Sequence, residues 1–194
     1  MLEVAFSNDG RYIIATDYKT LRQWDVSTGT LVRNIPLKNP VFSLGFTPDG
    51  KNVLLGSWDI KLLDALDFKE VKTYGGDVES YESAALSPDG QRAVLGGFKV
   101  VKLLDINSGR EIKTITGQGS WSTSVLFSPD GKYASSGGWS RYDRLQNSKP
   151  THGEQYHAIK IWDVSTGTMV KALTGHTRRV SSCAISADGR YLVS

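Results

Sequence analysis

The histidines are the residues of this chain whose type and spacing could bind a metal ion. There are three of them, His152, His157 and His176, and Glu154 lies between the first two. A zinc site needs three or four such groups to converge at about 2.0–2.2 Å from the ion. The same spacing also fits solvated loop histidines that bind nothing. We therefore expect no metal site, and we expect added zinc to leave the melting temperature unchanged.

A basic and aromatic segment offers a second kind of chemistry, the recognition of anions. It spans residues 139–157 and includes Trp139, Arg141, Tyr142, Arg144, Lys149, Tyr156 and His157, with Asp143 and Glu154 partly offsetting the charge. Forked arginine contacts suit the carboxylates or phosphates of an acidic or phosphorylated peptide. The segment is short for a nucleic-acid interface, which disfavours that partner. The alternative is a solvated insertion that binds nothing, since loops tolerate insertions.

Catalytic motifs are missing from the sequence. No Gly-x-Ser-x-Gly follows a strand and opens a helix, as the nucleophile of an acyl-transfer enzyme would require. Gly117 and Gly119 lie between predicted β-strands and not before a helix, so they do not form a phosphate-binding loop. We expect no catalytic residues, no enzymatic activity and no cofactor.

Asp-Gly dipeptides recur at a nearly constant interval along the chain. They begin at residues 9, 49, 89, 130 and 188, so the steps are 40, 40, 41 and 58 residues. A period of this length is typical of four-stranded propeller blades. The last step, 58 against 41, adds 17 residues between Gly138 and Ile159, which predicts a loop insertion in the fourth repeat.

A second signature ends the third predicted strand of each repeat. It reads Trp24-Asp25, Leu63-Asp64, Leu104-Asp105 and Trp162-Asp163, and Gly175-His176 precedes the last repeat. With the phased Asp-Gly turns, these residues resemble the WD-repeat family of β-propellers over essentially the whole chain. The resemblance implies an all-β propeller in which Trp24, Leu63, Leu104 and Trp162 pack between blades and His176 caps one. If so, replacing Trp24 or Trp162 by alanine should each cost roughly 3–5 kcal/mol.

The repeats predict one domain, residues 1–194, with four complete four-stranded blades and about half of a fifth. The expected repeats are 1–40, 41–80, 81–121, 122–176 (with the insertion at 139–157) and 177–194. In each Asp-Gly turn the glycine should take a positive φ, and Asn8 and Ala187, in place of the proline of the three middle copies, should loosen the first and last turns. Because Ser194 falls inside a second strand, we expect an incomplete propeller, a fragment with exposed strand edges.

Composition limits the partners, the disulfide content and the cellular location that can be expected of the protein. The chain is 39% hydrophobic with a net charge of +3, which allows a sizeable core and gives no argument for nucleic acid. Its single cysteine, Cys183, excludes an internal disulfide framework and falls on an apolar strand position. No run of 18 apolar residues and no signal peptide is present, so no membrane association and a cytoplasmic location are expected.

An aromatic residue follows the second predicted strand in each of the first four repeats. These residues are Tyr18, Trp58, Phe98 and Trp139. In the family that the chain resembles, the loops after second strands open on the same face as the loops between blades, where Arg178 and Arg179 lie. Aromatic residues and arginine dominate binding hot spots. The partner-binding candidates are therefore these four aromatics with Arg141, Tyr142, Arg144, Arg178 and Arg179. The alternative is that the aromatics only pack the edge of each blade.

The resemblance implies a non-catalytic scaffold for protein–protein interaction that presents these loops to a protein or peptide. Two alternatives remain open. The chain could be the propeller portion of a larger regulatory or enzymatic protein, or a propeller that binds a small ligand or a metal. A closed polar pocket with convergent histidine or carboxylate groups would favour the last of these.

Overall fold

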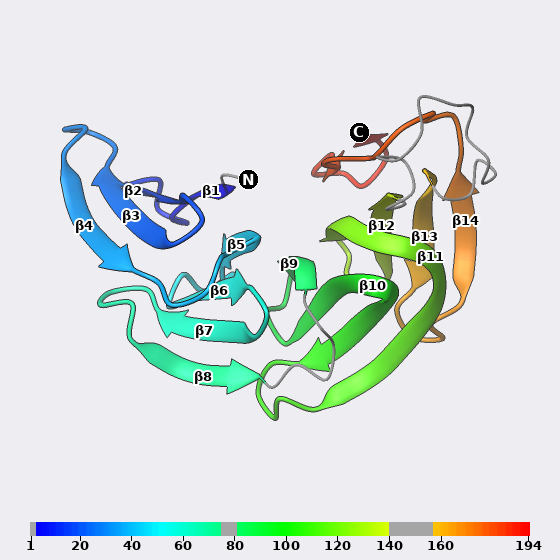
Figure 1. The fold of residues 1–194 in the computed structure, drawn as a ribbon, viewed down its shortest axis with the longest axis horizontal. Helices are drawn as coiled ribbons and strands as arrows, with labels where there is room; N and C mark the ends of the chain where they lie inside the picture. Colours follow the sequence, from blue (N-terminus) through cyan, green and yellow to red (C-terminus); the bar gives the residue numbers. More distant parts are fainter. Residues whose placement is uncertain (1–2, 75–80, 140–156) are drawn as a thin grey trace. The chain divides into compact units, whose positions relative to one another are not determined.

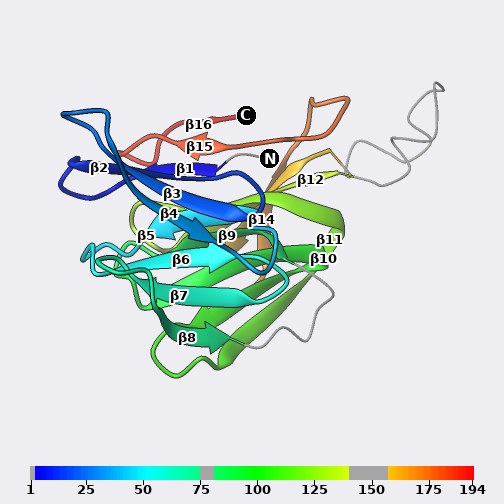
Figure 2. The same cartoon turned by 60° about the vertical axis from the view of Figure 1, so that its left-hand side comes forward.

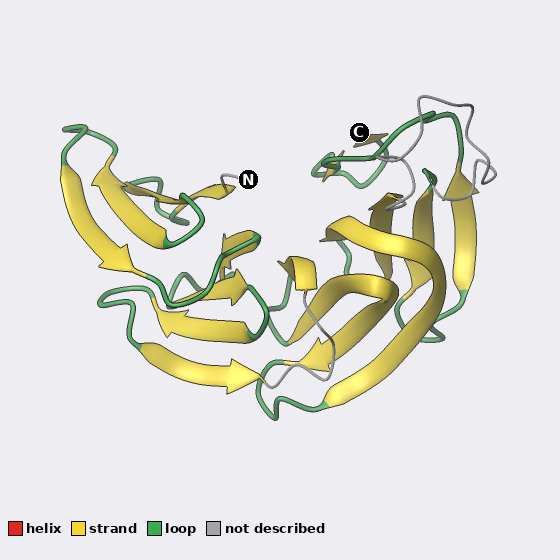
Figure 3. Cartoon of the chain, in the orientation of Figure 1, coloured by secondary structure: helices red, strands yellow, loops and turns green. Residues whose placement is uncertain are grey.

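A computed structural model describes residues 3–74, 81–139 and 157–194, and every helix or strand assigned in these ranges is a β-strand (Figure 3). The prediction of an all-β fold is confirmed. The chain divides into two compact units, Met1–Tyr81 and Glu82–Ser194, called here the N-terminal unit and the C-terminal unit. In the described ranges, no helix exists that could cross a membrane.

The N-terminal unit contains two four-stranded antiparallel sheets, each with its strands in sequence order (Figure 1). The first sheet is built from β1 (Glu3–Phe6), β2 (Tyr12–Thr16), β3 (Thr20–Asp25) and β4 (Leu31–Pro36). The second is built from β5 (Ser43–Phe46), β6 (Asn52–Gly56), β7 (Ile60–Asp64) and β8 (Glu70–Tyr74). Figure 2 shows β6, β7 and β8 side by side in the second sheet. Each sheet corresponds to one predicted repeat.

The C-terminal unit contains a six-stranded sheet and a two-stranded sheet. The six strands, again neighbours in sequence order, are β9 (Tyr81–Leu86), β10 (Arg92–Asp105), β11 (Glu111–Phe127), β12 (Tyr133–Trp139), β13 (Ile159–Asp163) and β14 (Met169–Leu173). The two-stranded sheet pairs β15 (Ala184–Ile185) with β16 (Leu192–Val193). These last strands occupy the first and second strand positions of the fifth repeat.

Two long strands differ from the prediction of four short strands in every repeat. β10 contains the second and third predicted strands of the third repeat, and it turns back at Lys99, whose φ is +59°. Its two ends meet again, because the Ile106 N–H donates to the Gln91 carbonyl at 2.9 Å. β11 continues through the expected boundary at residues 121 and 122, since Trp121 pairs with both Phe98 and Trp139. Backbone pairing therefore joins the third and fourth repeats into one sheet.

The Asp-Gly turns repeat one hydrogen-bonded arrangement, seen in the first of them. The Ser7 hydroxyl donates to Asp9 Oδ1 at 2.6 Å, and that oxygen also accepts from the Arg11 N–H at 3.0 Å. Gly10 takes a φ of +69°, and the glycines of the other four turns lie within a few degrees of it. The predicted positive φ is therefore confirmed. An L-residue with a Cβ would be strained in this left-handed conformation.

Neighbouring turns interlock within each unit. A Cβ added to Gly131 would lie 3.5 Å from Pro88 Cδ, and one added to Gly189 would lie 3.4 Å from Pro129 Cδ. Asn8 occupies the same position in the first turn, and its amide donates to the carbonyls of Thr47 and Pro48 at 3.0 and 2.7 Å. The expectation that Asn8 loosens its turn is therefore wrong, because its side chain ties that turn to the next one.

Each unit has an apolar core, and the two signature tryptophans differ in their burial. Trp162 is 3% exposed within the core of the C-terminal unit, and Leu63 is 5% exposed within that of the N-terminal unit. Leu104 is also buried. Trp24 is only half-buried, which corrects its assignment to the core. Since it pairs with Ile13, it lies on the face of the first sheet opposite the core, where Phe6 is 59% exposed.

The aspartates of the second signature fasten the turn that follows the third strand. Asp163 Oδ1 accepts hydrogen bonds from the Ser165 hydroxyl at 2.6 Å and from the backbone N–H groups of Ser165 and Thr166 at 2.9 and 2.8 Å. These bonds, with Ser165 contributing most, lower the Asp163 pKa from 3.8 to about 2. Asp25, Asp64 and Asp105 accept equivalent backbone bonds from Ser27, Leu66 and Ser108. The role of these aspartates in the repeat is thus structural.

The lowered pKa of Asp163 predicts a pH dependence of stability. Because the pKa is lower in the folded than in the unfolded state, ionised Asp163 stabilises the fold fully above about pH 4, and this contribution is lost as the pH falls towards about 2. Asp163→Asn should therefore reduce the loss of unfolding free energy between these values. Urea unfolding of both proteins at each end of the range measures it, and identical pH slopes would contradict the assignment.

Candidate functional site

The side chains of three of the four aromatic candidates are described by the structure, and each keeps about half of its surface exposed. The exposed fractions are 51% for Tyr18, 53% for Trp58 and 47% for Phe98. The Tyr18 and Phe42 rings are T-shaped with centroids 6.3 Å apart, and the Phe98 and Trp121 rings are tilted with centroids 5.0 Å apart. Tyr18 and Phe98 therefore contact a neighbouring ring and still keep about half of their surface open to solvent.

The loop that carries Arg178 and Arg179 lies beside the start of the insertion. The Val180 N–H donates to the Gly138 carbonyl at 3.4 Å, and the Val180 carbonyl accepts from the Thr123 hydroxyl at 2.5 Å. Arg178 is exposed and Arg179 is half-buried. The backbone thus brings this loop to the end of β12. The side chain of Trp139, and all of Arg141, Tyr142 and Arg144, lie outside the described residues.

The histidines do not form a metal site in the part of the chain that the structure describes. His157 is buried, and His176 Nε2 lies 2.6 Å from the Ser194 hydroxyl. His152 and Glu154 lie outside the described residues. Within those residues, no group of three histidine, cysteine, aspartate or glutamate side chains could hold an ion.

Burial raises the pKa of the Cys183 thiol, which disfavours the reactive thiolate.

The tryptophan of the fourth repeat takes part in a buried polar contact. The Trp162 indole N–H donates to the Ser136 hydroxyl at 2.8 Å, between β13 and β12. A buried indole N–H needs an acceptor, so this bond ties β13 to β12. The exposed contact between His176 Nε2 and the Ser194 hydroxyl, at 2.6 Å, links the residues before the fifth repeat to the end of that repeat.

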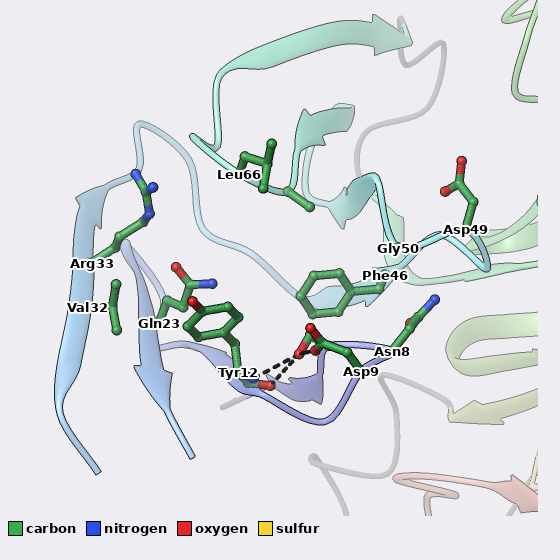
Figure 4. Close-up of a pocket in the computed structure, with 12 residues that line it drawn as sticks. Asn8, Asp9, Tyr12, Gln23, Val32, Arg33, Phe46, Asp49, Gly50 and Leu66 are labelled. Atoms are coloured by element: carbon green, nitrogen blue, oxygen red, sulfur yellow. Dashed lines mark hydrogen bonds between the residues drawn. The ribbon is translucent and has the colours of Figure 1, made fainter. Parts of the chain in front are cut away.

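A pocket lies between the two sheets of the N-terminal unit, at the end that carries the Asp-Gly turns. Its volume is about 330 Å³, and Asp9, Asp49 and Gly50 of these turns form one side (Figure 4). Other walls come from the inner strand β3, from β4 and from the turn after β7. This end of the sheets is opposite to Tyr18 and Trp58, which follow the other ends of β2 and β6. The pocket was not among the predicted sites.

An irregular turn beside the pocket was the sequence signal that could have found it. Residues 65–68 read Ala-Leu-Asp-Phe, where the other repeats have glycine in the fourth position. Phe68 takes that left-handed position with a φ of +56°, which is strained for a bulky residue. Its side chain is only 6% exposed and packs in the core, which offsets the strain. The same turn leaves Leu66 79% exposed at the pocket.

Comparison with known proteins gives a family and a fold. The WD40 family model, described as WD domain, G-beta repeat, matches residues 2–25, 109–145 and 167–194. The chain is 32% identical over 93 residues to the serine-threonine kinase receptor-associated protein of Gallus gallus, covering 47% of this chain and 26% of that protein. It is 51% identical over 37 residues to the nuclear distribution protein PAC1 of Arthroderma otae, covering 19% of this chain and 8% of that protein.

The chain thus spans about a quarter or less of the length of these relatives. Among solved structures, hydrazine synthase of Kuenenia stuttgartiensis superposes with a TM-score of 0.79 at 19% identity, covering 98% of this chain and 60% of that one. At this identity the likeness concerns the fold alone. WD40 domains generally mediate protein–protein interactions. The chain thus contains segments similar to WD40 repeats, and its phased turns and antiparallel sheets fit a β-propeller fold.

Proposed function

We propose that this chain is a non-catalytic scaffold that binds a protein or peptide partner through the loops following the second strand of each repeat. The observation that carries the proposal is the repeated exposure of an aromatic side chain at one position. Tyr18, Trp58 and Phe98 each remain about half exposed there. Large aromatic side chains that are rigid and partly open to solvent anchor interfaces at a small entropic cost.

The partner is proposed to be acidic or phosphorylated near the fourth repeat. Arg178 and Arg179 lie in the loop that the Val180–Gly138 hydrogen bond holds at the start of the insertion. The insertion itself supplies Arg141 and Arg144. Guanidinium groups bind carboxylates and phosphates in a forked geometry, so a cluster of them favours such a partner.

Replacing Arg141, Arg144, Arg178 and Arg179 together by alanine should weaken capture of the partner and leave the fold intact. The exposed part of this set steers an acidic partner by charge, and salt screens that attraction. A pulldown with the immobilised chain, repeated at low and high salt, measures the effect. The difference between the variant and the wild type should shrink at high salt.

Lys51, Lys132 and Arg190 provide the matched control, because these exposed basic residues follow Asp-Gly turns at the opposite ends of their strands. Alanine at these three positions should leave capture unchanged. If capture is lost with the three control changes and kept with the four arginine changes, then the proposed recognition loops are wrong.

A further inference from the structure

We propose that the pocket at the Asp-Gly end of the N-terminal unit binds a short peptide segment of a partner protein. One leucine-sized apolar side chain would enter the pocket, and an adjacent carboxylate would bind Arg33. This site is separate from the recognition loops proposed above, because it lies at the other ends of β2 and β6. Either proposal can therefore fail without the other.

The apolar walls of the pocket are poorly covered by the protein itself. Leu66 is 79% exposed and Val32 is 47% exposed, and the half-buried ring of Phe46 lies between the two sheets (Figure 4). Each buried methylene favours binding by about fourfold, so covering these side chains with a leucine-sized group is a substantial gain. At about 330 Å³ the pocket is large enough for such a group and too small for a whole folded element.

A buried amide gives the pocket a polar floor. Gln23 on β3 is 5% exposed, and Figure 4 shows its side chain directed toward the space beside Tyr12. Its amide is not among the fully buried side-chain atoms that lack a partner in the described residues, so the polar atoms that it brings to the lining of the pocket are not a buried defect. A glutamine amide offers one carbonyl acceptor and two N–H donors, which complement the C=O and N–H of a peptide group. The floor therefore fits a peptide backbone better than a wholly apolar ligand.

Charged residues at the rim of the pocket determine on which side of the apolar residue the ligand should carry an acidic residue. Arg33 is exposed and forms no ion pair within 4.0 Å among the described residues, while the nearby Asp67 is paired with Lys69 at 2.7 Å. The guanidinium is thus available to a carboxylate of the ligand. Asp9 and Asp49 carry negative charge on the other side of the pocket, which disfavours an acidic residue there. The ligand should therefore carry its acidic residue directly before or after the apolar one, on the side of Arg33 and away from Asp9 and Asp49.

The turn that presents Leu66 is held in place by the fold. The Leu66 N–H donates to Asp64 Oδ1 at 2.7 Å, and the Phe68 N–H donates to the Asp64 carbonyl at 2.9 Å. Burial of the Phe68 ring keeps this turn in its left-handed conformation. A wall that is fixed before binding loses little conformational freedom when the ligand arrives.

Two fluorescein-labelled peptides, Ser-Glu-Leu-Lys-Ser and its reverse order Ser-Lys-Leu-Glu-Ser, test the proposal by fluorescence polarisation with the 194-residue chain. At least one should bind saturably. The same peptide with alanine in place of leucine should bind at least tenfold more weakly, since about three buried carbons are lost. Glutamine in place of glutamate should weaken binding to the wild type, and Arg33→Ala should remove that difference.

Leu66→Ser is the main protein variant, because serine stands at this position in the first and fourth repeats and Leu66 is 79% exposed. It should weaken binding at least fivefold, and Gln23→Leu should do the same with the apolar volume kept. Val71→Ser, at a 58% exposed strand position outside the pocket, should change nothing.

Four results would overturn the proposal. The first is no saturation by either peptide up to about 1 mM. The second is equal affinity for the leucine and alanine peptides, and the third is loss of binding with Trp58→Ala and not with Leu66→Ser. The fourth is a dimer in light scattering that Leu66→Ser converts to a monomer, since the pocket would then be occupied by a second copy of the chain.

Discussion

Replacing Trp162 by alanine is expected to lower the free energy of unfolding by about 3–5 kcal/mol, the range for truncating a buried aromatic side chain. The indole is 3% exposed and packs with Val101, Phe127 and other core residues of the C-terminal unit. The change also removes the hydrogen bond to the Ser136 hydroxyl. Chemical denaturation followed by circular dichroism measures the loss.

Two related variants show how much of this loss comes from apolar packing and how much from the hydrogen bond. They also test whether the Trp-Asp motif alone decides the cost. Trp162→Phe keeps most of the apolar surface and removes the indole N–H, so it should cost about 0.5–1.5 kcal/mol for the hydrogen bond plus a smaller packing loss. Trp24→Ala should cost clearly less than Trp162→Ala, because Trp24 is half-buried. Equal losses at both tryptophans would mean that the face of the first sheet that carries Trp24 is covered as fully as the core.

The sequence alone was sufficient for the local features of the fold. Asp-Gly turns depend on a few adjacent residues, and Gly10 and its counterparts have the positive φ that their position predicted. The strands could also be predicted, because their alternation of apolar and polar residues is a property of adjacent positions. The coverage of a sheet face is not local. Trp24 and Trp162 stand in the same motif, yet they differ in burial because different amounts of chain pack over them.

The candidate site was predicted only in part, for the same physical reason. The repeat period predicted that an aromatic residue follows each second strand. It could not predict that Trp58 would be 53% exposed. The pocket depends on two sheets meeting, so the sequence carried only an indirect signal of it, the glycine-free turn at residues 65–68. The continuity of β10 and β11 likewise depends on pairing between Phe98 and Trp121, which are distant from the turn motifs.

Gly96→Ala should destabilise the C-terminal unit by about 1–3 kcal/mol or more, as overpacking of a tight core does. A Cβ at this position in β10 would lie 2.6 Å from Ser122 Cβ, 2.9 Å from the Ser122 carbonyl oxygen and 2.9 Å from Val125 Cγ1. Ser122 is fully buried and its carbonyl belongs to β11, so the neighbours have little room to move. The expected loss exceeds the gain of about 0.5–1 kcal/mol that alanine otherwise brings to a strand interior.

Gly45→Ala is the matched control, since Gly45 also lies inside a strand, β5, and a Cβ there meets nothing within 4 Å. This variant should be neutral or slightly more stable than the wild type, because alanine restricts the unfolded chain. Urea unfolding of both variants against the wild type decides the matter. If Gly96→Ala and Gly45→Ala have the same effect, then β10 and β11 do not approach each other as closely at Gly96 as the structure has them, and glycine is not required there.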